Sequence, residues 1–204
     1  ACACQTVIMN KRLESLKAVS DLADFPKKHA GKCSIDFFTV PTATFNILFV
    51  LVILRHCRRK VVHFNVTSNP SRQWTAQQVL EAFPWETAPK YLMRDRDSIY
   101  GVFFRNRVKN MGIKEIISAP RSPWQNPFIE RIIGSIRRKC TDRVIVLNEA
   151  HQTSVLCSYF EYYHKDRTHL SLEKGTPDGL PDNPGQPANE NNQFAASRWA
   201  LSSV

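Results

Sequence analysis

Three acidic residues of this chain stand at positions where a charge needs a partner. Asp36 interrupts the apolar run 35–38, and a carboxylate in such a run costs free energy unless a cation compensates it. Asp95 directly follows the apolar stretch 91–93, and the carboxyl end of a strand is where open α/β sheets place ligand-binding groups. Glu130 lies on the strongest helical pattern of the chain. Together these residues predict a set of hard oxygen ligands.

Carboxylates in this combination suit Mg²⁺ or Mn²⁺, and two such ions about 3.5–4 Å apart can stabilise the attacking and leaving oxygens at a phosphate. We therefore predict that Asp36, Asp95 and Glu130 are both the metal ligands and the catalytic residues. Each residue taken alone also fits a plainer role. Asp36 could face water on an edge strand, Asp95 could be a turn residue paired with Arg94 or Arg96, and Glu130 could be a solvated helix residue.

The elements around these residues follow from hydrophobic periodicity. Three β-rich runs predict an antiparallel meander: 34–40, 47–54 and 61–66. The following units are predicted as a helix at 74–83, a strand at 90–93, a helix at 101–111, a strand at 113–119 and helices at 128–147 and 151–163. Such units add parallel strands, so we expect an α/β fold with a mixed five-stranded sheet flanked by helices. Periodicity does not give the strand order.

The helix predicted at 128–147 has one face that must contact a core. Its apolar stripe consists of Ile129, Ile132, Ile133, Ile136 and Cys140. Glu130 then shares a second face with Gly134, Arg137 and Thr141, roughly 100° from the first, which places its carboxylate at the rim of the core. A glycine inside a helix costs about 1 kcal/mol relative to alanine, so we expect another group to approach Gly134 closely.

Three stretches carry a resemblance to a known family. Residues 34–39 (SIDFFT), 93–100 (MRDRDSIY) and 122–131 (SPWQNPFIER) resemble the three acidic blocks of bacterial insertion-sequence transposases related to retroviral integrases, the integrase catalytic core. In that family a Pro and an Asn precede the catalytic Glu of a long helix, and the second and third acids are close to 35 residues apart; here 130 − 95 = 35. Residues 162–169 (YYHKDRTH) resemble the Tyr-rich end of that family's catalytic core. The resemblance covers roughly residues 33–175.

The resemblance implies a ribonuclease H-like fold and the activity of a DDE-type polynucleotidyl transferase, which cleaves and joins DNA with two Mg²⁺ or Mn²⁺ ions. It also implies that the partners are transposon ends and target DNA, that the chain forms a homo-oligomer when assembled on DNA, and that it acts in the bacterial cytoplasm. Two positions depart from the family pattern. Asp97 stands where relatives often have Gly, which leaves it as an alternative second carboxylate, and Lys139 stands where many have Glu.

The charge of the chain favours a polyanionic partner. The net charge of +10 and the pI of about 9.5 create a surface field that attracts nucleic acid, although a basic surface can also serve solubility alone. We predict DNA contacts along the strongest helix, at Arg131, Arg137, Arg138 and Lys139. A second basic patch is predicted at Arg105, Arg107 and Lys109.

The chain divides into three parts. We expect residues 1–32, with a short helix at 11–22, to be a leader or linker left from a missing N-terminal DNA-binding region, 33–175 to be the catalytic core, and 176–204 to be a disordered tail. No apolar run is long enough to cross a membrane. Six cysteines without a C-x-x-C pair predict reduced thiols rather than a zinc site or a disulfide framework. Two alternative functions remain: a ribonuclease H-like nuclease without strand transfer, and a truncated, inactive relative that only binds DNA.

Overall fold

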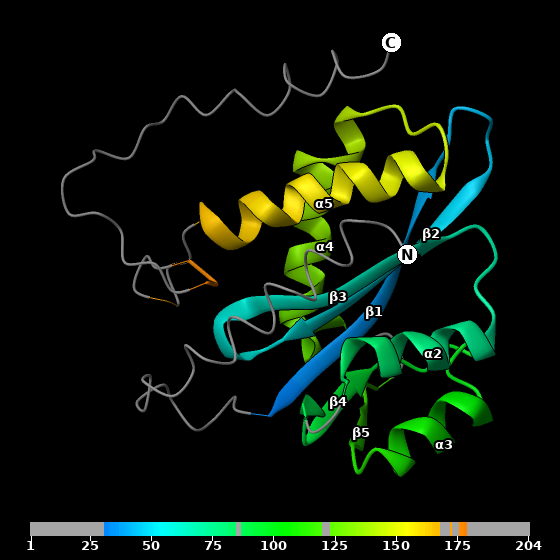
Figure 1. Cartoon of the computed structure of the whole chain (residues 1–204), viewed down its shortest axis with the longest axis vertical. Helices are drawn as coiled ribbons and strands as arrows, with labels where there is room; N and C mark the ends of the chain where they lie inside the picture. The colour runs from blue at the N-terminus through cyan, green and yellow to red at the C-terminus, as the bar shows by residue number, and fades with distance from the viewer. Residues whose placement is uncertain (1–30, 85–86, 120–122, 168–171, 173–175, 179–204) are drawn as a thin grey trace.

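The computed structural model describes residues 31–84, 87–119, 123–167, 172 and 176–178. Its centre is a five-stranded sheet in the order β3-β2-β1-β4-β5 (Figure 1). The strands are β1 (Lys32–Pro41), β2 (Ile47–Arg55), β3 (Lys60–Thr67), β4 (Tyr91–Arg94) and β5 (Lys114–Ile117). The first three strands pair antiparallel, and β4 and β5 run parallel to β1. The predicted mixed sheet is confirmed. The helix predicted at 11–22 and most of the tail predicted at 176–204, residues 179–204, lie outside the described residues.

In the described part of the chain, four α-helices accompany the sheet. They are α2 (Arg72–Ala82), α3 (Val102–Asn110), α4 (Pro127–Lys139) and α5 (Glu149–Lys165), with 3-10 turns η2 (Cys57–Arg59), η4 (Pro123–Gln125) and η5 (Thr141–Arg143). The Ser71 side chain accepts a hydrogen bond from the Trp74 N–H and so caps the start of α2. Gly112, at φ +71°, follows α3 in the left-handed region, which glycine adopts without a steric cost.

The predicted helix at 128–147 is wrong at its carboxyl end. Helix α4 stops at Lys139, and Cys140 has a non-helical backbone. Farther on, Val146 is buried and forms a parallel bridge with Thr42, and its carbonyl accepts the Ala43 N–H at 2.7 Å. The chain leaves the helix because Val146 gains both burial and backbone hydrogen bonds by extending along the end of β1.

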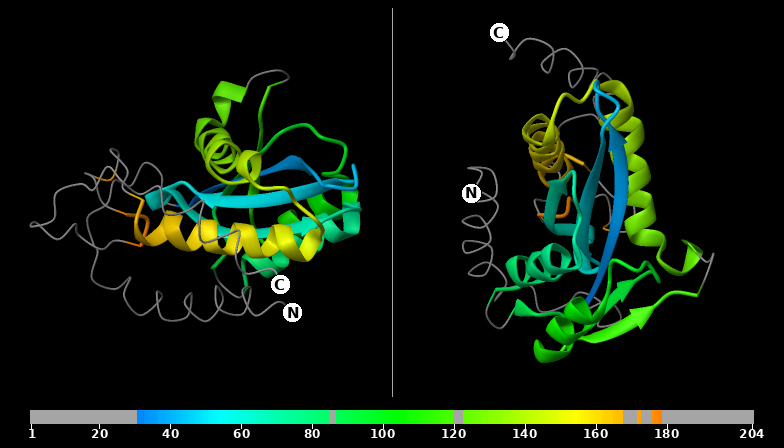
Figure 2. Two further views of the ribbon diagram at one scale, coloured as in Figure 1. Left: turned by 90° about the horizontal axis from the view of Figure 1, so that it is seen from above. Right: turned by 90° about the vertical axis from the view of Figure 1, so that its right-hand side faces the viewer.

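The two faces of the sheet carry different helices. Phe38 and Val40 of β1 share a core cluster with residues of α4 and α5. Cys33 and Ile35 belong to the opposite cluster, with α2 and α3. All five positions of the predicted apolar stripe are buried in the first cluster: Ile129, Ile132, Ile133, Ile136 and Cys140. Helix α4 therefore runs along β1 (Figure 2), and α2 and α3 lie side by side near β4 and β5 (Figure 1).

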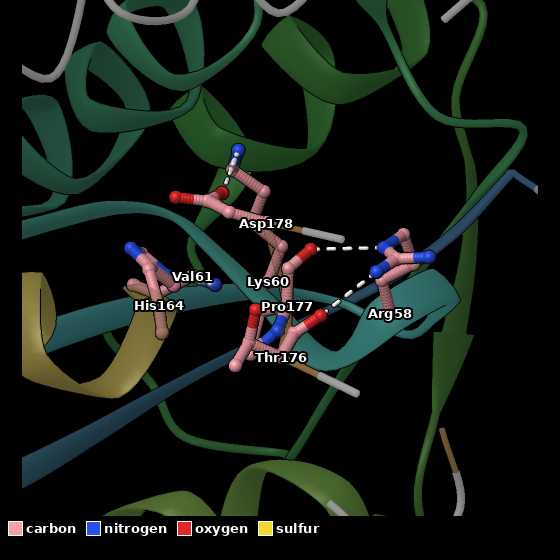
Figure 3. A network of polar contacts seen from close by, with 7 residues as sticks. All are labelled: Arg58, Lys60, Val61, His164, Thr176, Pro177 and Asp178. Atoms are coloured by element: carbon pink, nitrogen blue, oxygen red, sulfur yellow. Dashed lines mark hydrogen bonds and ion pairs between the residues drawn. The ribbon is translucent and has the colours of Figure 1, made fainter. Parts of the chain in front are cut away.

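The turn between β2 and β3 is held by contacts from far along the chain (Figure 3). Arg58 and Arg59 have φ values of 56° and 54°, which cost about 1 kcal/mol or more each for residues with a Cβ. The Arg58 guanidinium donates hydrogen bonds to the carbonyls of Thr176 at 2.8 Å and Pro177 at 2.9 Å, and Lys60 pairs with Asp178 at 2.6 Å. Residues 176–178 therefore pack on the core, beyond the end at 175 that the sequence suggested.

Two further expectations concern reduced cysteines and the lack of a membrane-spanning segment. Cys33, Cys57 and Cys140 are free thiols, but Cys157 is disulfide-bonded, so the prediction of reduced thiols throughout is wrong at Cys157. Residue spacing missed this bond because pairing depends on proximity in the fold. Among the described residues, no helix combines the length and the apolar character that spanning a bilayer requires.

The α4 stripe should dominate stability on its side of the sheet. Ile136 is fully buried, so Ile136→Ala should lower the free energy of unfolding by about 2–5 kcal/mol through lost burial and a cavity. Ile145, which is 76% exposed, provides a matched control whose change to Ala should stay within about 0.5 kcal/mol. Urea unfolding of the two variants measures both values; equal effects would contradict the assigned packing of α4.

Candidate active site

The pairing of β1 with β4 brings Asp36 and Asp95 side by side. Ser34 lies opposite Met93 in this parallel pair, an offset of 93 − 34 = 59 residues. The same offset relates Asp95, one residue beyond the end of β4, to Asp36, since 95 − 36 = 59. Neighbouring strands are about 4.8 Å apart, so Asp36, in the middle of β1, and Asp95, just past β4, stand at the same level of adjacent strands.

Glu130 approaches the same place from α4. The pKa of Asp36 is raised from 3.8 to about 7, chiefly by burial, and the negative charges of Asp95 and Glu130 contribute to the rise. A hydrogen bond of 2.8 Å from the Phe37 N–H and the Arg137 guanidinium oppose it. Asp95 and Glu130, the other two acids that the sequence singled out, therefore both lie within electrostatic range of Asp36.

The side chains of Asp36, Asp95 and Glu130 are not arranged to hold one metal ion in common. Asp36 Oδ1 accepts the Phe37 N–H, and Asp95 Oδ1 accepts the Asp97 N–H at 3.2 Å. Within the described residues, no group of three or more His, Cys, Asp or Glu side chains is arranged to hold a metal ion. The chemistry of the donors nevertheless fits Mg²⁺ or Mn²⁺, because all are carboxylate oxygens and a bound cation would offset the like-charge repulsion and the burial that raise the pKa of Asp36.

Asp97, the alternative second carboxylate, has a different local role. Its Oδ1 accepts the Ile99 N–H at 3.0 Å and the Ser98 hydroxyl at 3.3 Å, which shapes the turn that leads into α3. Asp97 therefore lies in an exposed turn, whereas Asp95 continues the register of β4.

Several residues near Asp95 have roles that the sequence did not indicate. Arg94 is buried and pairs through Nε with Glu115 at 2.6 Å, while its Nη1 donates to the Asp95 carbonyl at 2.8 Å. The suggested ion pair between Arg94 and the Asp95 carboxylate is therefore wrong. Tyr100 is buried, and its hydroxyl has no hydrogen-bond partner among the described residues. Burial raises the Tyr100 pKa well above its usual range, and the charge of Asp36 raises it further.

The basic residues predicted to contact DNA are all exposed, but they form two separate surfaces. The α4 surface contains Arg131, Arg137, Arg138 and Lys139, and the α3 surface contains Arg105, Arg107 and Lys109. These helices cover opposite faces of the sheet. Beside Asp97, a cavity of about 480 Å³ is lined by further arginines, Arg72, Arg94 and Arg96, together with Arg105. The expected approach to Gly134 comes from the Arg138 side chain of the same helix.

Comparisons with known proteins agree with this architecture. Residues 111–177 match the family model described as integrase core domain. A chain of the cryo-EM structure of the simian T-cell lymphotropic virus intasome in complex with PP2A regulatory subunit B56 gamma matches with a TM-score of 0.58 and 14% identity, over 78% of this chain and 58% of that chain. The crystal structure of the catalytic core domain of BIV integrase has a TM-score of 0.49 and 15% identity, over 72% of this chain and 91% of that chain. No curated protein matches the chain in sequence.

The matched family segment contains Glu130 and the helices α4 and α5, whereas Asp36 and Asp95 precede it. The mixed five-stranded sheet with its flanking helices is the ribonuclease H-like fold of integrase catalytic cores. Residues 111–177 are thus similar to an integrase core domain, and the described part of the chain shares the fold of integrase catalytic cores.

The raised pKa of Asp36 has a measurable consequence without metal. A carboxyl group whose pKa is higher in the folded than in the unfolded state destabilises the fold as it ionises, so stability should fall as the pH rises from about 4 to about 7. In EDTA at about pH 8, Asp36→Asn should therefore be more stable than the parent chain by roughly 1–3 kcal/mol, allowing for solvent screening.

At about pH 4 this difference should vanish, because the Asp36 carboxyl is then largely protonated in the folded state. Thermal unfolding at the two pH values gives the comparison. Asp142→Asn, at an exposed position of η5, serves as the control and should show no such pH dependence. A gain in stability that is the same at both pH values would contradict the assigned environment of Asp36.

Proposed function

We propose that this chain is the catalytic core of a transposase or integrase, a DDE-type polynucleotidyl transferase that cleaves and joins DNA in a metal-dependent reaction. The observation that carries the proposal is that Asp95, just past β4, and Glu130, on α4, both act electrostatically on Asp36 of β1. The integrase core match over residues 111–177 supports it. Asp95 is preferred to Asp97 because Asp95 shares the register of Asp36.

The proposed reaction has two phosphoryl-transfer steps. In the first, a water oxygen attacks a phosphorus at the end of the element, the bond from phosphorus to the 3′-oxygen breaks, and that oxygen takes up a proton. In the second, the freed 3′-hydroxyl loses its proton and attacks a target phosphodiester, whose own 3′-oxygen leaves, so the number of phosphodiester bonds is unchanged. Two bound Mg²⁺ or Mn²⁺ ions would stabilise the attacking and leaving oxygens.

In this proposal Asp36, Asp95 and Glu130 hold the ions. Because its pKa is about 7, the Asp36 carboxyl is partly protonated at neutral pH, and it would hold a cation in its ionised form. The α4 surface and the α3 surface, with Arg72 and Arg96, bind the phosphate backbones of transposon ends and target DNA. The chain works as a homo-oligomer assembled on DNA in the bacterial cytoplasm.

Two other functions use the same residues and are separated by one assay. A nuclease without strand transfer would share the carboxylates, and an inactive relative would keep only the basic surfaces. The protein is incubated with Mn²⁺, a supercoiled plasmid and labelled DNA from the ends that flank its gene. Joined products support strand transfer, nicks alone indicate the nuclease, and DNA binding without either product indicates the inactive relative.

The carboxylates should be needed for cleavage but not for DNA binding. Asp36→Asn, Asp95→Asn and Glu130→Gln should each lower the cleavage rate by about 10³-fold or more, equivalent to about 4 kcal/mol of lost transition-state stabilisation. Affinity for DNA should be unchanged or higher because a negative charge is removed. Asp97→Asn is the matched control and should stay active; an inactive Asp97→Asn beside an active Asp95→Asn would show that the second carboxylate is Asp97.

The α4 surface should contribute to the salt dependence of DNA binding. Each phosphate contact adds about 0.9 to the slope of log affinity against log salt concentration. The double variant Arg137→Glu with Arg138→Glu should therefore bind more weakly and flatten the slope by about 1–2. Lys90→Glu with Lys114→Glu makes the same charge change at exposed positions outside both surfaces. Equal slopes for the two double variants would mean that net charge, and not the α4 surface, determines binding.

A further inference from the structure

A buried hydrogen-bond network is centred on Ser34, two residues before Asp36 in β1. The Ser34 Oγ is 2.6 Å from Asn126 Oδ1 and 2.6 Å from His56 Nε2. Ser34 is fully buried, and His56 and Asn126 are 6% and 7% exposed. Ser34 lies in β1, His56 directly follows β2 and Asn126 directly precedes α4, so the network links β1 and the end of β2 to the helix that carries Glu130.

The proton positions in this network follow from what each atom can do. An amide oxygen only accepts hydrogen bonds, so the single Ser34 hydroxyl proton points to Asn126. Ser34 Oγ must then accept a proton from His56, which therefore carries hydrogen on Nε2. His56 in this way fixes the direction in which the Ser34 hydroxyl donates. The His56 ring also contacts the Phe128 ring edge-on at 4.9 Å, in the first turn of α4.

The Asn126 side chain bonds to Ser34 in place of the helix-capping hydrogen bond that its position favours. It is the residue before α4, where an Asn side chain normally caps the helix and contributes about 1 kcal/mol, yet it makes no capping hydrogen bond. Its main-chain carbonyl accepts the Glu130 N–H at 3.3 Å. Asn126 therefore contacts Ser34 through its side chain and Glu130 through its main chain.

Ser34 stands two residues before Asp36, on the same face of β1. A continuous path of one strand and two hydrogen bonds thus connects the Asp36 carboxyl to the Glu130 backbone. We propose that Ser34 and Asn126 are positioning residues that set the separation of Glu130 from Asp36, with His56 orienting the Ser34 hydroxyl, and that the affinity for divalent cations depends on this network. The inference rests on the proposed function, because it assumes that Asp36 and Glu130 share a cation.

The test compares two identical substitutions of buried serines. Ser34→Ala removes the centre of the network. Ser135→Ala removes a buried hydroxyl of the same helix-bearing layer, one that accepts the Tyr159 hydroxyl at 3.0 Å and an Arg167 N–H and lies farther along α4. Both changes leave buried polar partners unsatisfied and should lower the melting temperature in EDTA. The further readout is the Mn²⁺ concentration that gives half of the metal-induced rise in melting temperature.

Ser34→Ala should raise that Mn²⁺ concentration by about tenfold, equivalent to about 1.4 kcal/mol of binding free energy. Ser135→Ala should leave it within about twofold. If activity is present, saturating Mn²⁺ should restore most of the cleavage rate of Ser34→Ala, since a positioning residue acts through the bound metal. Asn126→Ala tests the other end of the path and should resemble Ser34→Ala.

An unchanged Mn²⁺ affinity in Ser34→Ala, or an equal loss in Ser135→Ala, would overturn the inference while leaving the proposed function intact. A parent chain whose melting temperature does not respond to Mn²⁺ would instead overturn the proposed function, and the positioning role with it. If Ser34→Ala does not fold, Asn126→Ala takes its place in the same comparison, because the Ser34 hydroxyl can then still bond to His56.

Discussion

The short parallel pairing between β1 and β4 is the interaction on which the candidate site depends. It involves only three residue pairs, yet it fixes the offset that carries Asp95 to the level of Asp36. A shift of one residue would turn the side chains of β4 to the opposite faces of the sheet and move the Asp95 carboxyl away. The long antiparallel pairing of β1 with β2 holds β1 firmly enough for such a short partner to be specified.

This arrangement places like charges together on a stable scaffold. The buried core on the side of α4 and α5 supplies the hydrophobic free energy, and the repulsion among Asp36, Asp95 and Glu130 opposes it locally. The Phe37 N–H and the Arg137 guanidinium lower the Asp36 pKa but do not cancel the rise. A site that is electrostatically unfavourable when empty is one that gains free energy from a cation, which links the folding of β1 and α4 to the chemistry proposed for them.

The positions of the strands and helices could be predicted from the sequence because they depend on local patterns of residues. Strand and helix positions followed from periodicity, and the stripe of α4 gave its buried face and the place of Glu130. The end of α4 could not be read, since Val146 leaves the helical pattern to pair with Thr42, about a hundred residues earlier in the chain. The network of Ser34, His56 and Asn126 and the pair Arg94–Glu115 were also missed, because each joins residues that are distant in sequence. A buried serine between apolar strand residues was the one local sign of the network.

The contacts of the β2–β3 turn make the order of synthesis matter. The two Arg58 hydrogen bonds join residues 118 and 119 positions apart. A ribosome adding roughly 5–20 residues per second needs on the order of ten seconds to make the intervening chain. During that interval the left-handed Arg58 and Arg59 lack these bonds, so the newly made hairpin is less stable than in the finished core. The nascent protein therefore has a window in which β3 can detach or pair with another strand, and the arrival of residues 176–178 closes it.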